Sequence, residues 1–136
     1  MVHAVVTRYL KEDVPFNCAE MLIYAAAEAF CLDLSEDVLR AMAPFGSGMA
    51  LGETCGAISG ALAVIGLLYT RGTARETPEL KDLAVAFQEA FRQSMGTLRC
   101  TDLKKDHPEG CGTIMLLAAQ LLDALINRTA VSRRIS

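Results

Sequence analysis

The longest apolar stretch of the chain runs from Cys55 to Tyr69 and contains no charged side chain. It is interrupted only by three glycines and one serine, and it is shorter than the roughly 20 residues that a helix needs to cross a bilayer. Its residues are apolar on every side of a helix, a pattern typical of a helix that is surrounded by protein. We therefore predict a buried central helix at approximately residues 54–70.

The composition indicates that the surrounding elements are also helices. Hydrophobic residues make up 52% of the 136 residues, aromatic residues only 6%, and tryptophan is absent. This composition is typical of closely packed helices rather than of a β-sandwich, and the length suits one domain with a sizeable core. We predict an all-α fold: a compact bundle of about five helices around the central apolar helix, in a single domain spanning residues 1–136.

Capping patterns place two helices before the central one. Asn17 and Glu20 have the spacing of a capping box, which predicts a helix from Cys18 to about residue 31. Ser35 has the character of a helix cap, and Pro44 must end the short helix that follows it.

Two more helices are predicted after the central one. Thr77 caps a helix that has Pro78 in its first turn and ends at Gly96. The last helix follows Gly112 and carries a leucine-rich apolar stripe. The segments between helices, residues 45–54 and 97–110, are interpreted as loops. The first is flexible and rich in glycine, and the second is polar, irregular and carries Cys100.

Charge and hydropathy exclude several classes of protein. The formal net charge of −3 is spread along the chain, and the only basic block is Arg133–Arg134 near its end, so we expect no binding to nucleic acid. The first residues lack the charged start and long apolar stretch of a secretory signal. We therefore expect a cytoplasmic protein without membrane insertion.

The five cysteines are the candidate functional residues, because a reducing cytoplasm keeps thiols free for metal binding or redox chemistry. Cys18, Cys55 and Cys111 fall at predicted helix N-termini, where backbone amides lower the pKa of a thiol. Cys100 lies in the polar loop, and a turn would bring it to Cys111. Cys31 points away from Cys18 along its helix, so we expect it to be a small buried hydrophobic residue.

No Cys-x-x-Cys pair occurs in the chain, which argues against a thioredoxin-type centre or a zinc ribbon. Any site must therefore be assembled by folding. Four sulfur ligands from separate segments would suit an iron-sulfur cluster or zinc. The spacing alone leaves open that the cysteines only pack in the core.

Residues beside Cys55 are candidates for contact with a ligand. Gly56 and Gly60 lie on one helix face, where another backbone or a cofactor can approach closely. Glu53 and Thr54 come directly before Cys55 and either tune it, bind a ligand, or act as helix caps.

The ordered set of cysteine motifs resembles the redox-active protein family named for its four cysteines and a Cys-Gly-Ala-x-x-Gly motif. Residues 55–60, Cys-Gly-Ala-Ile-Ser-Gly, resemble that motif. Cys18 resembles the family's first cysteine, and Cys100 and Cys111 its closing pair. The resemblance runs from about Asn17 to the last helix. It implies a helical, redox-active or cofactor-bearing domain, similar in part to a domain joined to haem-binding segments in some cytochromes. No Cys-x-x-Cys-His motif is present, so covalent haem is not implied.

Together these observations predict a redox protein for electron transfer, or for binding of an iron-sulfur cluster or another thiolate-bound metal. The predicted catalytic and metal-binding residues are Cys18, Cys55, Cys100 and Cys111, and the predicted cofactor-binding residues are Gly52, Glu53, Thr54, Gly56 and Gly60. Two alternatives stay open: a thiol-disulfide oxidoreductase with no cofactor, and a helical interaction module with structural cysteines. We expect a redox partner protein, and a homodimer because so small a chain has limited interior for its apolar surface.

Overall fold

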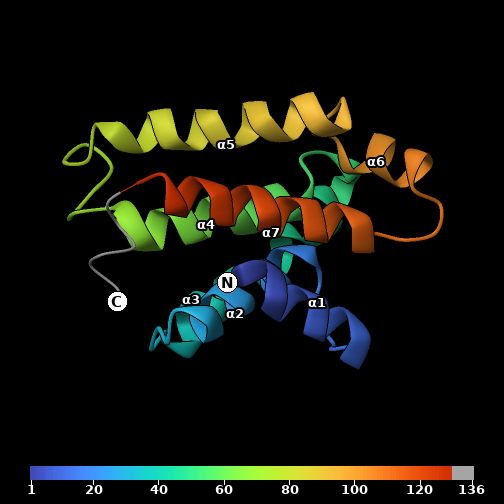
Figure 1. The fold of residues 1–136 in the computed structure, drawn as a ribbon, viewed down its shortest axis with the longest axis horizontal. Helices are drawn as coiled ribbons and strands as arrows, with labels where there is room; N and C mark the ends of the chain where they lie inside the picture. Colours follow the sequence, from blue (N-terminus) through green and yellow to red (C-terminus); the bar gives the residue numbers. More distant parts are fainter. Residues whose placement is uncertain (130–136) are drawn as a thin grey trace.

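The computed structural model describes residues 1–129 and confirms the predicted all-α fold (Figure 1). Arg133 and Arg134, the basic pair considered above, lie outside the described residues. Seven α-helices and two short helical turns make up the regular structure of residues 1–129: α1 (Val2–Glu12), α2 (Cys18–Ala29), α3 (Glu36–Ala41), η1 (Ala43–Phe45), η2 (Gly48–Gly52), α4 (Gly56–Tyr69), α5 (Glu79–Met95), α6 (Cys100–Asp106) and α7 (Gly112–Asn127).

Helix α4 is the predicted central helix, and it packs against α2, α5 and α7. In Figure 1, α4 and α7 lie between α5 on one side and the pair α1 and α2 on the other. Ile58, Val64 and Ile65 of α4 are almost completely buried. None of the helices in residues 1–129 is long and apolar enough to span a membrane.

Gly60 allows α4 to approach α2 closely. A Cβ atom added at Gly60 would lie 2.6 Å from the backbone oxygen of Ala19 and 2.9 Å from the Cβ of Leu22. These distances are shorter than van der Waals contact, so only glycine fits without a shift of one helix. The expected close approach at this glycine is therefore made by another backbone.

The predicted starts of α2 and α3 are confirmed. Asn17 accepts a hydrogen bond from the Glu20 amide (2.9 Å), and the Asn17 amide donates to the Glu20 carboxylate (3.0 Å), completing the capping box. The Ser35 hydroxyl accepts a hydrogen bond from the Val38 amide (3.3 Å) at the start of α3. Helix α2 ends at Ala29, before the predicted position.

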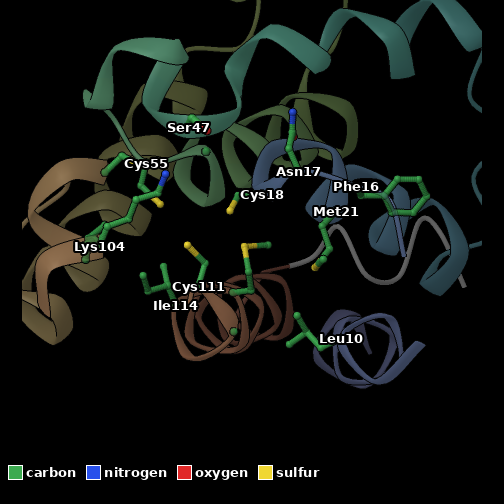
Figure 2. A pocket seen from close by; sticks show the side chains of 15 residues that line it. Leu10, Phe16, Asn17, Cys18, Met21, Ser47, Cys55, Lys104, Cys111 and Ile114 are labelled. Carbon is green, nitrogen blue, oxygen red and sulfur yellow. The ribbon is translucent and has the colours of Figure 1, made fainter. Parts of the chain in front are cut away.

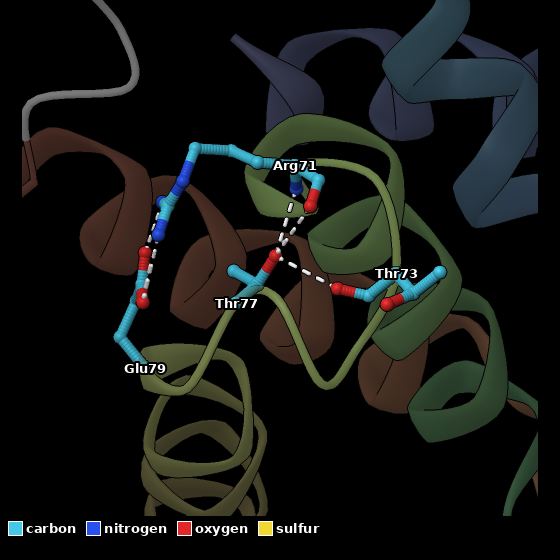
Figure 3. Close-up of polar contacts among 4 residues, drawn as sticks. All are labelled: Arg71, Thr73, Thr77 and Glu79. Atoms are coloured by element: carbon cyan, nitrogen blue, oxygen red, sulfur yellow. Dashed lines mark hydrogen bonds and ion pairs between the residues drawn. The ribbon is translucent and has the colours of Figure 1, made fainter.

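The predicted cap at Thr77 is wrong, because its side chain holds the loop before α5 instead (Figure 3). The Thr77 hydroxyl accepts a hydrogen bond from the Arg71 amide (2.8 Å) and points to the carbonyl oxygens of Arg71 and Thr73 (3.2 and 3.1 Å). Arg71 also forms an ion pair with Glu79 in the first turn of α5. The side chain of Thr77 therefore faces the loop and is buried.

Helices α1 and α6 were not predicted, so the bundle contains more helices than expected. Helix α1 buries Val2, Val6 and Tyr9 against the bundle, and the Asp123 carboxylate of α7 accepts hydrogen bonds from the Val2 and His3 amides (both 2.9 Å). Because Asp123 is distant from α1 in the sequence, patterns among neighbouring residues do not predict this cap.

The segment interpreted as an irregular loop contains α6, from Cys100 to Asp106. Asp102 in its first turn and Lys104 and Lys105 in its last turn complement the helix dipole, whereas Asp106 at its end opposes it. Leu103 anchors the helix, because it is almost completely buried. The segment is too short and too polar to show the apolar stripe that predicts a helix.

Two glycines of α4 provide a matched test of the contact between α4 and α2. We expect Gly60→Ala to lower the free energy of unfolding by about 1–3 kcal/mol, because its Cβ would overlap the α2 backbone. Gly66→Ala meets nothing within 4 Å and should raise it by up to about 1 kcal/mol through helix propensity. Urea unfolding measures both values, and equal effects of the two substitutions would contradict the close contact.

Candidate functional site

Four cysteines that are far apart in the sequence line one cavity of about 320 Å³: Cys18, Cys55, Cys100 and Cys111. Figure 2 shows the labelled cysteine side chains directed into the space between α2, α4 and α7. The fifth cysteine, Cys31, does not line it. The structure thus brings together the four residues that the sequence singled out, while their chemical roles stay a prediction.

Each of the four cysteines lies at the beginning of a helix. Cys18 and Cys100 are the first residues of α2 and α6, and Cys55 and Cys111 directly precede α4 and α7. The placement of Cys100 in a loop is therefore corrected. The N-terminal ends of four helices therefore lie around the cavity. The site is assembled from separate segments and not from one short sequence motif.

The expectation that Cys31 is buried is wrong. Cys31 is exposed and follows the end of α2, with a φ of 53° in the left-handed region. Because α2 ends at Ala29, this residue leaves the helix and never reaches the core. Cys31 is therefore a free surface thiol outside the cavity.

The four cavity cysteines lie at two depths. Cys55 and Cys100 are only 4% and 6% exposed, whereas Cys18 and Cys111 are half-buried. Among the other cysteines, Cys111 contributes most to the raised pKa of Cys18, and Figure 2 shows the two sulfur atoms pointing into the same space. The cavity therefore has an inner pair of cysteines and a more accessible outer pair.

Burial, together with repulsion from Cys111 and Cys55, raises the pKa of the Cys18 thiol from 9.0 to about 12. Burial also raises the pKa of Cys55, although the nearby amides of Ala57 and Ile58 act in the opposite direction. The expectation that helix starts lower these two pKa values is therefore wrong. The loss of hydration outweighs the favourable amides.

Backbone contacts with the segments before α4 and α6 hold the inner pair, Cys55 and Cys100, in place. The Cys100 amide donates to the backbone oxygen of Glu53 (2.6 Å), and the Cys55 amide donates to that of Leu98 (2.8 Å). Gly48, at φ 63°, lies so close to Cys100 that an added Cβ would be 2.7 Å from the Cβ of that cysteine. These backbone contacts fix the two cysteines side by side.

The predicted cofactor-binding residues have different locations. Gly56 lines the cavity, and an added Cβ there would lie 3.1 Å from the Cβ of Cys18. Gly60 instead faces α2.

The three predicted residues before Cys55 contact the start of α6 and the residue before it. Gly52 accepts a hydrogen bond from the Thr101 hydroxyl (2.9 Å) through its backbone oxygen. Glu53 forms an ion pair with Arg99 (3.6 Å) at the surface, and Thr54 pairs with Arg99 through the backbone. Of the five predicted cofactor-binding residues, only Gly56 is among the described residues that line the cavity.

The remainder of the wall is mostly apolar and includes residues that sequence analysis did not select: Leu10, Phe16, Met21, Leu103, Ile114 and Met115. Asn17 and Ser47 add polar groups, and Lys104 adds a positive charge. Lys104 follows Cys100 by four residues, which is one helical turn. That spacing would have pointed to Lys104 if residues 100–106 had been recognised as a helix.

The donor chemistry of the cavity is that of soft sulfur ligands, which suit iron and zinc. However, no group of three or more Cys, His, Asp or Glu side chains in residues 1–129 is placed to hold one metal ion. The four sulfurs line the wall of a cavity and do not meet at a point. The arrangement therefore suits a group of several atoms bridging the cysteines, or disulfide chemistry between them, better than a single ion.

These features define a class of helical protein in which separate helix starts supply four cysteines to one cavity. Residues 16–125 match the model of the family described as "Putative redox-active protein (C_GCAxxG_C_C)". The chain belongs to this family. No curated protein matches the chain, and no solved structure matches it.

The pH dependence of stability tests the buried Cys18 thiol. A thiol whose pKa is raised from 9.0 to about 12 on folding contributes stability that is fully present below pH 9 and is lost as the pH rises toward 12. In reduced, metal-free protein we expect this group to remove up to about 1.4 kcal/mol of unfolding free energy per pH unit in that window.

Cys18→Ala should therefore make the free energy of unfolding, measured in urea between pH 8 and 10.5, fall less steeply with pH. Cys31→Ala is the matched control, because this exposed thiol lies outside the cavity, and it should keep the original slope. The same slope in Cys18→Ala and the unsubstituted protein would contradict the raised pKa.

Proposed function

We propose that the chain is an electron-transfer protein in which the four cavity cysteines bind an iron-sulfur cluster as thiolates. The observation that carries the proposal is that Cys18, Cys55, Cys100 and Cys111 line one cavity. Membership of a family described as redox-active supports the same chemistry. An iron-sulfur cluster supplies reversible one-electron chemistry when it is bound.

The two depths of the cysteines suggest separate roles in holding such a group. Cys55 and Cys100 are held at the inner wall by backbone hydrogen bonds, so they provide fixed ligands. Cys18 and Cys111 close the cavity at its more accessible side. The apolar side chains of Leu103, Ile114 and Met115 exclude water, which protects a thiolate-bound group from hydrolysis and exchange.

The raised pKa values of Cys18 and Cys55 support binding of a positively charged group. Without a positive group in the cavity, several thiolates so close together would repel one another and lack hydration. The four cysteines would hold iron as thiolates after losing their protons, and the charge of the metal would offset their repulsion and lost hydration. The proposal therefore explains why the fold collects in one cavity four thiols, of which Cys18 and Cys55 resist ionisation on their own.

Analysis of iron and acid-labile sulfide after anaerobic purification tests the cluster. We expect both elements in the unsubstituted protein and at least a tenfold loss in Cys55→Ser, because an inner ligand is removed. Cys31→Ser is the matched control and should retain both, since Cys31 lies outside the cavity. Protein that contains neither iron nor sulfide, also after reconstitution with both, would contradict the cluster.

A second candidate function is thiol-disulfide exchange without a metal, in which the site has no cofactor. The interaction between Cys18 and Cys111 on the accessible side of the cavity favours it. In this reaction one thiolate attacks a disulfide of a partner protein and forms a mixed disulfide. The second thiol of the chain then displaces the partner, which leaves with two thiols while the chain retains a disulfide.

Thiol titration before and after a mild oxidant distinguishes this candidate. In metal-free protein with the Cys31→Ser substitution, we expect oxidation to remove two thiols reversibly and peptide mapping to find the bond between Cys18 and Cys111. Cys18→Ser or Cys111→Ser should prevent this loss. A disulfide that forms equally well in Cys18→Ser would contradict the pairing.

The proposed function requires a redox partner and a reducing compartment. A redox partner protein must deliver or accept the electrons, and a reducing compartment such as the cytoplasm would keep the thiols free. We also propose a homodimer, which would cover exposed apolar side chains such as Leu67 and Val85.

A further inference from the structure

The register of α6 directs a lysine toward the cysteine cavity. Cys100 begins the helix, and Lys104 follows it by one turn, so both residues lie on the same face. Lys104 lines the cavity together with the four cysteines. Figure 2 shows its side chain extending along the wall toward the region of Cys55. Lys105 lies about 100° further around the helix and does not line the cavity.

Lys104 has no competing carboxylate at the cavity. Among the residues from 1 to 129 that line it, Lys104 is the only charged side chain. Within the same part of the chain, no ion pair involves Lys104. The neighbouring cation of this region, Arg99, differs in this respect, because Glu53 (3.6 Å) and Asp102 (3.9 Å) neutralise it. Lys104 is therefore an exposed lysine whose side chain contributes the positive charge of the cavity wall.

A positive charge beside a thiolate site has a defined effect on its redox equilibrium. Reduction adds one electron, and hence one negative charge, to a site that already carries thiolates. A nearby ammonium group stabilises the more negative reduced form more than the oxidised form. The apolar wall weakens screening of this interaction, although Lys104 itself is exposed to solvent.

We propose that Lys104 is a positioning residue that offsets the negative charge of the four-cysteine site and raises its reduction potential. This inference rests on the proposed electron-transfer function and adds a residue outside the four cysteines and their glycine motif. Lys104 does not need to touch the electron-carrying group. Its long side chain lies along the cavity wall, and its ammonium group extends toward the region of Cys55 (Figure 2).

Redox titration of the anaerobically purified or reconstituted protein tests the inference, with dithionite as the one-electron reductant and visible absorbance as the readout. We expect Lys104→Gln to lower the equilibrium constant for reduction about threefold to tenfold, where tenfold corresponds to about 59 mV for a one-electron couple. Lys104→Arg should retain the original potential. Lys105→Gln is the matched control, with the same change in net charge, and should leave the potential unchanged.

Two further measurements separate the electrostatic effect from a structural one. The shift in Lys104→Gln should shrink at high ionic strength, because salt screens the charge of an exposed lysine. The iron content and thermal stability of Lys104→Gln should match those of Lys105→Gln. A loss of iron or of folding in Lys104→Gln alone, without a shift of potential in the remaining loaded protein, would overturn the inference.

Failure of this inference and failure of the proposed function give different results. An unsubstituted protein with a reversible couple, but with the same potential in Lys104→Gln and Lys105→Gln, would overturn the role of Lys104 alone. An equal lowering in both variants would also overturn it, because net charge and not position would then be responsible. If the unsubstituted protein shows no reversible couple and no iron, the proposed function and this inference are both overturned.

Discussion

The close contact between α2 and α4 is the constraint on which the cysteine cavity depends. Gly56 and Gly60 leave no room for a side chain between the two helices, because an added Cβ would meet backbone atoms of α2 at 3.1 and 2.6 Å. Gly56 directly follows Cys55 and lies against Cys18. The same contact that packs the bundle therefore brings two cysteines, far apart in the chain, to the same wall. A Cβ at Gly60 would require a shift of one helix, whereas at Gly56 it would require a neighbour to move by only a few tenths of an ångström.

The electrostatics of the cavity follow from competition between helix starts and burial. Four helix N-termini favour negative charge at the sulfurs, yet burial raises the pKa of Cys18 and Cys55. Lost hydration and mutual repulsion are the larger effects, because the thiols are removed from water together. Burial in this cavity therefore favours the neutral thiols of Cys18 and Cys55. Under the proposed function, positive charge from a bound metal or from Lys104 would counteract this effect.

The sequence was sufficient to predict those parts of the fold that local chemistry determines. The apolar segment that became α4, the Asn17–Glu20 capping box and the Ser35 cap were all predicted from neighbouring residues. The missed parts depend on contacts between distant segments. Asp123 of α7 caps α1, and burial of Leu103 in the assembled bundle anchors the short α6. Cys31 was misplaced because the helix before it ends two residues early. The four site cysteines were found from their motifs, whereas Lys104 required knowledge that α6 is a helix.

The loop before Cys55 shows that the bundle accepts a conformational cost next to this cavity. Ser47, Met49 and Ala50 have φ values between 54° and 65°, a left-handed region that costs a residue other than glycine roughly 1–2 kcal/mol. The loop is held by hydrogen bonds to its backbone, including those from the Cys100 amide to Glu53 and from the Thr101 hydroxyl to Gly52. A more relaxed path would break the contacts that keep Cys100 beside Cys55. The positions of the inner cysteines, Cys55 and Cys100, therefore account for the strained backbone of this loop.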